Sequence, residues 1–164
     1  MKNIQDRRAF VLKSLDDMGI AYEVYEHEPL PTIEIALSHW KGVEATHCKN
    51  LFFRNHKGNK HYLVILECHK EMNIHGLEQE LHQGKLSFAS AERLEKHLGT
   101  TPGSVSLFCL LNDPNHLVKL YLDKSLMEAE HLTFHPNENT ASLKISGADM
   151  RKFLELWGGE YELI

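Results

Sequence analysis

The chain has 164 residues, of which 42% are hydrophobic and 25% charged, and its formal net charge is -5. This composition suffices for the core of one globular domain spanning 1–164 and argues against a second full domain. No apolar stretch approaches the roughly 20 residues needed to cross a bilayer, and the charged N-terminus lacks a signal-peptide pattern, so we expect a cytoplasmic protein with no membrane partner.

The first elements along the chain are a helix and a strand. Apolar residues at helical spacing predict an amphipathic helix that ends before Gly19. A strand is expected over 22–27. Two prolines then interrupt the pattern, and Thr32 is a candidate cap for a short helix over 33–40.

The middle of the chain predicts a hairpin followed by helices. Aromatic and β-branched runs at 48–54 and 61–67 are separated by a polar segment of the kind that tight turns favour. Helical patterns cover 74–82 and 91–98, and Gly99 ends the second. The remaining expected elements are strands at 86–88, 105–111, 117–122, 131–134 and 141–145 and a last helix capped by Ser146. This interleaving predicts a mixed α/β fold, with a mostly antiparallel or mixed central sheet and flanking helices.

Cysteine usage and charge distribution bear on compartment and partners. The three cysteines form no CxxC pair, so we expect buried thiols in a reducing compartment. Over 41–60, five basic residues and one acid give +4, which leaves -5 - 4 = -9 elsewhere. A basic segment in an acidic chain favours a nucleic-acid contact, although a solvated basic hairpin remains the alternative. The basic residues are Lys41, Lys49, Arg54, Lys57 and Lys60.

Standard catalytic signatures are largely missing. The segment 103–107 lacks the second glycine of a nucleophile elbow, and there is no P-loop or dinucleotide fingerprint. The twelve histidines show neither HExxH nor the short Cys/His spacing of a zinc site. We therefore expect no metal and no cofactor.

One loop has the character of an oxyanion site. Gly99 is followed by Thr-Thr-Pro-Gly-Ser, a Pro-Gly turn that leads into an apolar run. Such a turn can present successive backbone N–H groups to a developing negative charge. A plain connector between two elements is the alternative reading of this loop.

Several short motifs around this loop occur in a characteristic order. They are Glu28-Pro29 with Thr32 and Glu34, Lys49-Asn50, the Gly99 to Ser104 loop, Leu111-Asn112-Asp113, and Phe134-His135-Pro136 followed by Asn139. Over roughly residues 5–157 this order resembles the YbaK/ProX family of aminoacyl-tRNA editing domains, in its freestanding branch.

The resemblance implies a mixed α/β fold and a deacylase that hydrolyses the ester between an amino acid and the 3′ end of tRNA. Its partners would be the acceptor end of tRNA, chiefly tRNA for proline, and prolyl-tRNA synthetase. Lys49 aligns with the essential lysine of the family, and His135 aligns with a pocket residue. The expected catalytic residues are Lys49, Gly99, Pro102 and Gly103; the expected substrate contacts are Thr32, Asn50, Phe52, Ser104, His135 and Asn139; the expected nucleic-acid contacts are Lys41, Arg54, Lys57 and Lys60.

The resemblance to the freestanding, alanine-editing branch implies alanine as the substrate, and a size argument supports it. A synthetase pocket that fits proline rejects a smaller side chain weakly, because a missing methylene is worth only about 1–3 kcal/mol. An editing pocket with walls from Leu51, Phe52 or Phe53 and His135 would exclude proline by clash and admit alanine, the substrate we expect on tRNA for proline. Leu107 and Cys109 stand where the family usually has proline and glycine, and Ile35 where a second glutamate is frequent, so other small acyl groups remain open.

Two other functions are compatible with the same residues. A nonenzymatic oligonucleotide-binding module would use the basic hairpin over 48–67 and stack bases on Phe52 or Phe53. A regulatory partner of prolyl-tRNA synthetase would need no catalysis. A deacylation assay separates both from the hydrolase.

Overall fold

A computed structural model of the chain describes residues 3–29 and 44–164. Thr32, Lys41 and the helix expected over 33–40 lie outside these residues. The N-terminal helix α1 covers Ile4–Asp17, and the positive φ of +71° at Gly19 follows its end. Strand β1, Glu23–Glu26, comes next, so the first two expected elements are confirmed.

The other helices begin and end at the residues that their caps predict. Helix α3 spans Ile74–Leu81, α4 spans Ala91–Leu98, and α5 spans Gly147–Trp157. The side chain of Ser90 caps α4 by accepting the N–H of Arg93, and Ser146 caps α5 by accepting the N–H of Asp149. Each serine satisfies a backbone donor that the first turn of a helix leaves unpaired.

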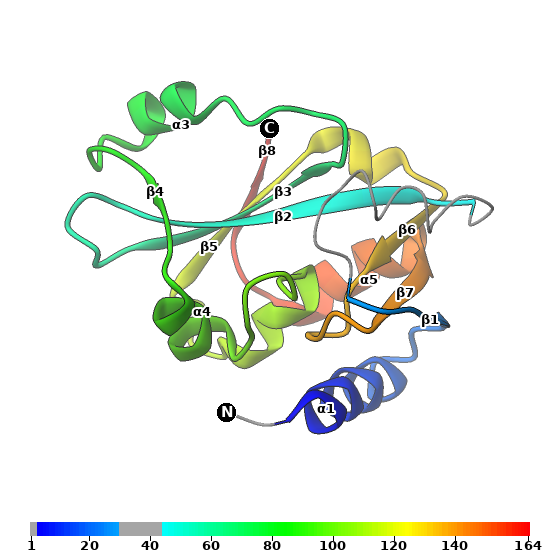
Figure 1. The fold of residues 1–164 in the computed structure, drawn as a ribbon. Coiled ribbons are helices and arrows are strands. Elements are labelled where there is room, and N and C mark those ends of the chain that lie inside the picture. Colours follow the sequence, from blue (N-terminus) through cyan, green and yellow to red (C-terminus); the bar gives the residue numbers. More distant parts are fainter. Residues whose placement is uncertain (1–2, 30–43) are drawn as a thin grey trace.

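The described strands form one mixed sheet, which confirms the expected fold class (Figure 1). Its order is β1-β7-β6-β2-β3-β5-β8, and β4 pairs with β2 beside this path. Pairs β2/β6, β3/β5 and β5/β8 are parallel, and the others are antiparallel. The bounds are β2 Thr46–Arg54, β3 His61–Glu67, β4 Ser87–Phe88, β5 Val118–Leu122, β6 His131–Phe134, β7 Ala141–Ser146 and β8 Tyr161–Leu163.

Strand β2 is the branch point of the sheet. One edge pairs with β3 along seven residues. The other edge pairs with β6 only at Thr46 and His47 and with β4 only at Phe53 and Arg54. Between these two contacts no strand of the described residues pairs with that edge, so β2 and β6 diverge and leave an opening beside residues 48–52.

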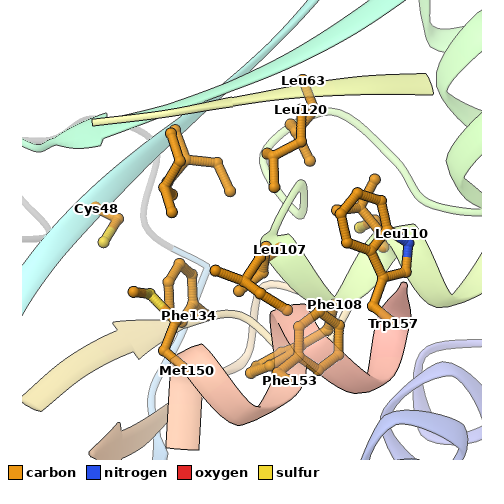
Figure 2. Close-up of a cluster of buried hydrophobic side chains, with 14 of the residues drawn as sticks. Cys48, Leu63, Leu107, Phe108, Leu110, Leu120, Phe134, Met150, Phe153 and Trp157 are labelled. Atoms are coloured by element: carbon orange, nitrogen blue, oxygen red, sulfur yellow. The ribbon is translucent and has the colours of Figure 1, made fainter. Parts of the chain in front are cut away.

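Each face of the sheet carries its own apolar core. The larger core gathers residues of α1, α4, α5 and their connections on one face, and Figure 2 shows Phe108 among Phe134, Phe153 and neighbouring side chains. The smaller core lies under α3 on the other face and includes Phe53 and Leu77. Burial on both faces explains why β3 is a continuous apolar run without alternation.

The strand expected over 105–111 is wrong, because residues Leu107–Asn112 form a 3-10 helix, η1. Its N-terminus is capped by Ser106, whose Oγ accepts the N–H of Phe108, while Cys109 Sγ accepts the N–H of Ser106. The run 107–110 is buried on every side. Periodicity cannot separate a buried helical turn from a buried strand when all positions are apolar.

Two elements at the end of the chain complete the fold. A short 3-10 helix, η2, spans Lys124–Glu128, and β8 adds a parallel edge strand to β5. Neither was expected from the sequence. Within the described ranges, no helix is long and apolar enough to cross a membrane.

Candidate active site

Lys49 and Asn50 lie in β2, at the opening of the sheet. Cys48 and Phe52 point into the larger core. Because side chains alternate along a strand, Lys49 lies on the opposite face of β2, on the same face as His47. Lys49 is half-buried, and its charge acts to lower the pKa of the Cys68 thiol, although burial dominates and raises that pKa to about 11.

Strand β6 pairs in parallel with the start of β2 and adds a polar side chain beside His47. His47 pairs with Thr133, and the distance from His47 Nδ1 to Thr133 Oγ1 is 2.6 Å. Continuing the same register by two residues puts Lys49 level with His135. Beyond the last pair the strands diverge, so Lys49 and His135 lie on the two sides of the opening.

A small cleft lies between the diverging strands, where side chains from both faces of the sheet meet. It has a volume of about 10 Å³, close to the minimum that holds one water molecule. Among the described residues, the buried Oδ1 of Asn50 has no hydrogen-bond partner, so an acceptor is available there. The lining residues are Cys48, Asn50, Thr133, Phe134, His135 and Ser142.

His135 is held as a neutral imidazole with a defined tautomer. Burial, with a smaller contribution from His27, lowers the pKa of His135. Its Nδ1 lies 2.8 Å from the carbonyl oxygen of Ala141 and must donate to it. The Nε2 atom of His135 is therefore left as an acceptor.

His27 and Ser142 belong to this site and were missed by the sequence interpretation. The rings of His27 and His135 meet edge to face with centroids 6.0 Å apart. His27 Nε2 lies 2.9 Å from Ser142 Oγ, and its Nδ1 lies 2.8 Å from the carbonyl of Glu28. The position of His27 directly before the Glu28-Pro29 motif was the one available signal.

The loop from Gly99 to Ser104 is shaped by its own hydrogen bonds. The N–H of Gly99 donates to Glu95 at the end of α4, and the N–H of Ser104 donates to the carbonyl of Thr101. Within the described part of the chain, this leaves the N–H groups of Thr100, Thr101 and Gly103 without an acceptor; Thr100 is fully buried, so Thr101 and Gly103 are the donors nearest to solvent. Pro102 and Gly103 are exposed, so the tip of the loop is accessible.

Asn137 fixes this loop against the segment that carries His135. Its carbonyl accepts the hydroxyl of Thr100, and its Oδ1 accepts from Ser106 Oγ and Cys109 Sγ. Asn137 is buried and has a φ of +60°, a region that asparagine adopts more readily than most residues. The sequence interpretation missed this residue.

Three further expected residues are accounted for. Asn139 lies beside the loop, since a Cβ added to Gly103 would be 3.8 Å from its Nδ2. Leu107 and Cys109 are fully buried and do not line the cleft. Cys109 instead donates its thiol to Asn137 Oδ1, and the carbonyl of Asn137 accepts the hydroxyl of Thr100 in the loop. Cys109 is therefore linked to the loop through Asn137.

The expected roles of Phe52 and Ser104 do not fit their burial. Phe52 is 4% exposed and stacks on His61, and Phe53 is 1% exposed in the other core. Both rings are held by core packing, so neither is a wall of the cleft or a surface for stacking bases. Ser104 is 1% exposed and its Oγ accepts the hydroxyl of Thr101. The exposed ring of this region is Phe88, which stacks on Phe53.

The basic residues of the hairpin lie at the far end of β2 from His135. Arg54 directs its Nη1 to the carbonyls of Asn55 and His56, while Lys57 and Lys60 are exposed in the turn. The structure therefore separates Arg54, Lys57 and Lys60 from Lys49, which the sequence had grouped with them.

One group of side chains in the described ranges could hold a metal ion. Glu67, Cys68 and His69 lie with their ligand atoms within 4.8 Å of one another. The three residues hydrogen-bond among themselves, with His69 Nδ1 2.6 Å from Glu67 Oε1. Glu67 ends β3, and none of the three lines the cleft.

Known proteins resemble this chain over most of its length. The sequence profile of the family described as "Aminoacyl-tRNA editing domain" matches residues 27–153. The "Prolyl-tRNA editing protein ProX" of Acetoanaerobium sticklandii is 36% identical over 160 residues, covering 97% of this chain and 97% of that protein. The "Prolyl-tRNA synthetase associated domain-containing protein 1" of Mus musculus is 31% identical and covers 92% of this chain and 91% of that protein.

A solved structure shares the fold. It is described as a candidate trans-editing enzyme for prolyl-tRNA synthetase, and it superimposes with a TM-score of 0.69 over 99% of this chain and 98% of its own, at 21% identity. At this identity the match concerns the arrangement of helices and strands. The mixed α/β fold is therefore common to both molecules.

Proposed function

The chain belongs to the family of aminoacyl-tRNA editing domains, and from this premise we propose that it is a trans-editing deacylase that removes alanine from mischarged tRNA for proline. The reaction is water attack on the ester at the 3′ end of the tRNA. The partners are the acceptor end of that tRNA and, in the course of translation, prolyl-tRNA synthetase.

One observation carries this proposal. Asn50 and His135 line one cleft beside β2, and the segment that follows His135 contacts the loop from Gly99 to Ser104 through Asn137 and Asn139. Lys49 precedes Asn50 in β2. A lysine, a loop with backbone donors at its tip and a neutral imidazole suffice for ester hydrolysis without a protein nucleophile.

Lys49 supplies the charge of the site. Its ammonium is compact and carries three donors without fixed geometry, which suits an anchor for the phosphate or ribose of the terminal nucleotide. This anchor holds the ester at a fixed distance from the loop. The ribose hydroxyl next to the ester assists the attacking water.

The loop stabilises the oxyanion. As the water attacks, the carbonyl oxygen becomes negative, and the N–H groups of Thr101 and Gly103 donate to it. Hydrogen bonds already hold the neighbouring N–H groups of Gly99 and Ser104, so the loop does not reorganise at the moment of reaction. Removing one such donor typically costs 10²–10³ in rate.

Asn50 and His135 select the acyl group. The Oδ1 of Asn50 and the Nε2 of His135 are acceptors beside the cleft, and the α-ammonium of the amino acid is the donor that matches them. The cleft is small, so a methyl group needs less rearrangement than the proline ring. Exclusion by clash is the discrimination that such a site provides.

The test is a panel of matched tRNAs for proline carrying alanine, serine, cysteine, threonine or proline, assayed for enzyme-dependent release with and without a chelator. We expect alanine to be released fastest, proline to be spared, and the chelator to have no effect. Faster release of another acyl group overturns the alanine assignment, and comparable release of proline overturns the editing role. Activity that is lost to chelator and restored by zinc overturns the metal-independent mechanism.

A further inference from the structure

We propose that a basic surface, built from the β2/β3 hairpin and helix α4, binds the phosphate backbone of the tRNA acceptor stem and leads its 3′ end to the Gly99–Gly103 loop. The proposal rests on the function proposed above and extends it to a helix for which the sequence gave no nucleic-acid role. The basic surface consists of Arg54, Lys57, Lys60, Arg93 and Lys96.

Arg93 joins the helix to the hairpin. Its Nη1 donates to the carbonyl of Gly58 at 2.7 Å and lies 3.0 Å from His61 Nε2. A Cβ on Gly58 would be 2.7 Å from Arg93 Nη2, so the glycine in the turn admits the guanidinium. The two halves of the basic surface are therefore in direct contact, although more than thirty residues separate them in sequence.

Helix α4 places basic side chains and a histidine on the side that meets the hairpin. Arg93, Lys96 and His97 are spaced i, i+3 and i+4, and Arg93 and His97 contact the hairpin directly, through Gly58 and His61. Glu92 lies one turn from Lys96, Glu95 lies further round the helix, and Leu94 and Leu98 are buried in the larger core. The contact with the hairpin is therefore made by the basic side chains.

A pair of histidines inside this surface reports its positive potential. The rings of His61 and His97 lie 3.9 Å apart. Burial, together with the charges of His97, Arg93, Lys96 and Arg54, lowers the pKa of His61 to about 4. Burial, Lys96 and Arg93 also lower the pKa of His97, against an opposing effect of Asp113. Phosphate groups would relieve the repulsion among these cations.

Helix α4 connects the basic surface to the candidate oxyanion loop. Gly99 is the C-cap of α4, so the helix that carries Arg93 and Lys96 runs directly into the candidate oxyanion loop. At 1.5 Å per residue, Arg93 lies only about 9 Å from Gly99 along the axis. A backbone that follows the basic surface along α4 arrives at the loop, where the ester must be placed.

The test measures binding separately from hydrolysis. The probe is a fluorescent, uncharged RNA hairpin with the acceptor stem and single-stranded 3′ end of tRNA for proline. The variant combines Lys57→Ala, Lys60→Ala and Lys96→Ala, all exposed. The matched control combines Lys13→Ala, Lys124→Ala and Lys152→Ala, exposed lysines of α1, η2 and α5 that remove the same charge. A single Lys96→Ala variant is compared with Lys152→Ala.

We expect the triple variant to bind the hairpin at least about tenfold more weakly and to lose about 2–3 from the slope of log affinity against log salt, since each phosphate contact contributes about 0.9. The control keeps wild-type affinity, and Lys96→Ala weakens binding where Lys152→Ala does not. In the wild type, bound RNA raises the pKa values of His61 and His97 measured by NMR.

Wild-type affinity and salt slope in the triple variant would overturn the basic surface, and equal binding by Lys96→Ala and Lys152→Ala would remove α4 from it. Because the probe carries no ester, these outcomes do not depend on catalysis. A wild type that binds the hairpin and hydrolyses no aminoacyl ester would overturn the proposed function instead.

Discussion

The two ends of β2 hold their polar groups in opposite ways. Beside Lys49, histidines are held by hydrogen bonds: His47 bonds Thr133, His27 bonds Ser142, and burial lowers the pKa of His135. Beyond Arg54, cations gather with one another, and after burial their charges are the further cause that lowers the pKa of His61. The first arrangement fixes geometry for a reaction, and the second provides attraction that tolerates many positions of an RNA backbone.

This difference predicts that a substitution near Lys49 lowers the rate of deacylation without lowering the affinity for RNA. Lys49→Ala should lower deacylation about 10²-fold, because the ester is no longer held in position for attack, while the RNA hairpin still binds within about twofold of wild type because phosphate affinity is spread over many contacts. Initial rates, anisotropy and a thermal melt measure the three quantities. A folded variant with wild-type rates would remove Lys49 from the mechanism.

A substitution at Gly99, at the start of the candidate oxyanion loop, should have a smaller effect on the rate, and Gly158 provides a matched control. Gly99 and Gly158 both end helices with positive φ, +62° and +76°. Alanine at either should therefore cost roughly 1–2 kcal/mol of stability, yet a Cβ at Gly99 would press on Asn112 at 3.0 Å and one at Gly158 meets nothing within 4 Å. We expect Gly99→Ala to lower kcat about tenfold at unchanged RNA affinity, because misdirected N–H groups weaken transition-state contacts first.

Gly158→Ala should leave kcat and RNA affinity at wild-type values. Equal kcat in the two variants would mean that the loop is a connector. A loss confined to RNA affinity in Gly99→Ala would mean that the loop is a binding surface.

The smallest expected effect is a pH dependence of folding stability that arises from His61, inside the basic surface. The folded pKa of His61, about 4, lies below its unfolded value of about 6.5. The unfolded state therefore binds the proton more tightly, so the stabilisation is complete above pH 6.5 and is lost as pH falls toward 4. We expect Tm to drop over this window and the drop to be shallower in His61→Gln. An equally steep drop in that variant would assign the effect to other groups.

Local patterns were sufficient for most of the elements. Capping side chains and helix-ending glycines predicted α1, α4 and α5, and runs of aromatic and β-branched residues on either side of a polar turn predicted the hairpin, because these preferences act within a few residues. The run 105–111 failed because it is apolar at every position, and its turn is decided by bonds among Ser106, Cys109 and Asn137. Strand β8 has no clear strand pattern in its sequence and is a strand because it pairs with β5.

The sequence by itself determined which residues could perform the chemistry: the order of short motifs pointed to Lys49, the loop after Gly99 and His135. Only the tertiary structure decided how they are used. It buried Phe52 and Ser104, brought His27 and Ser142 to His135, and joined Arg93 to the hairpin. The reason is physical, because motifs record local chemistry, whereas burial and long-range hydrogen bonds depend on which distant segments the sheet brings together.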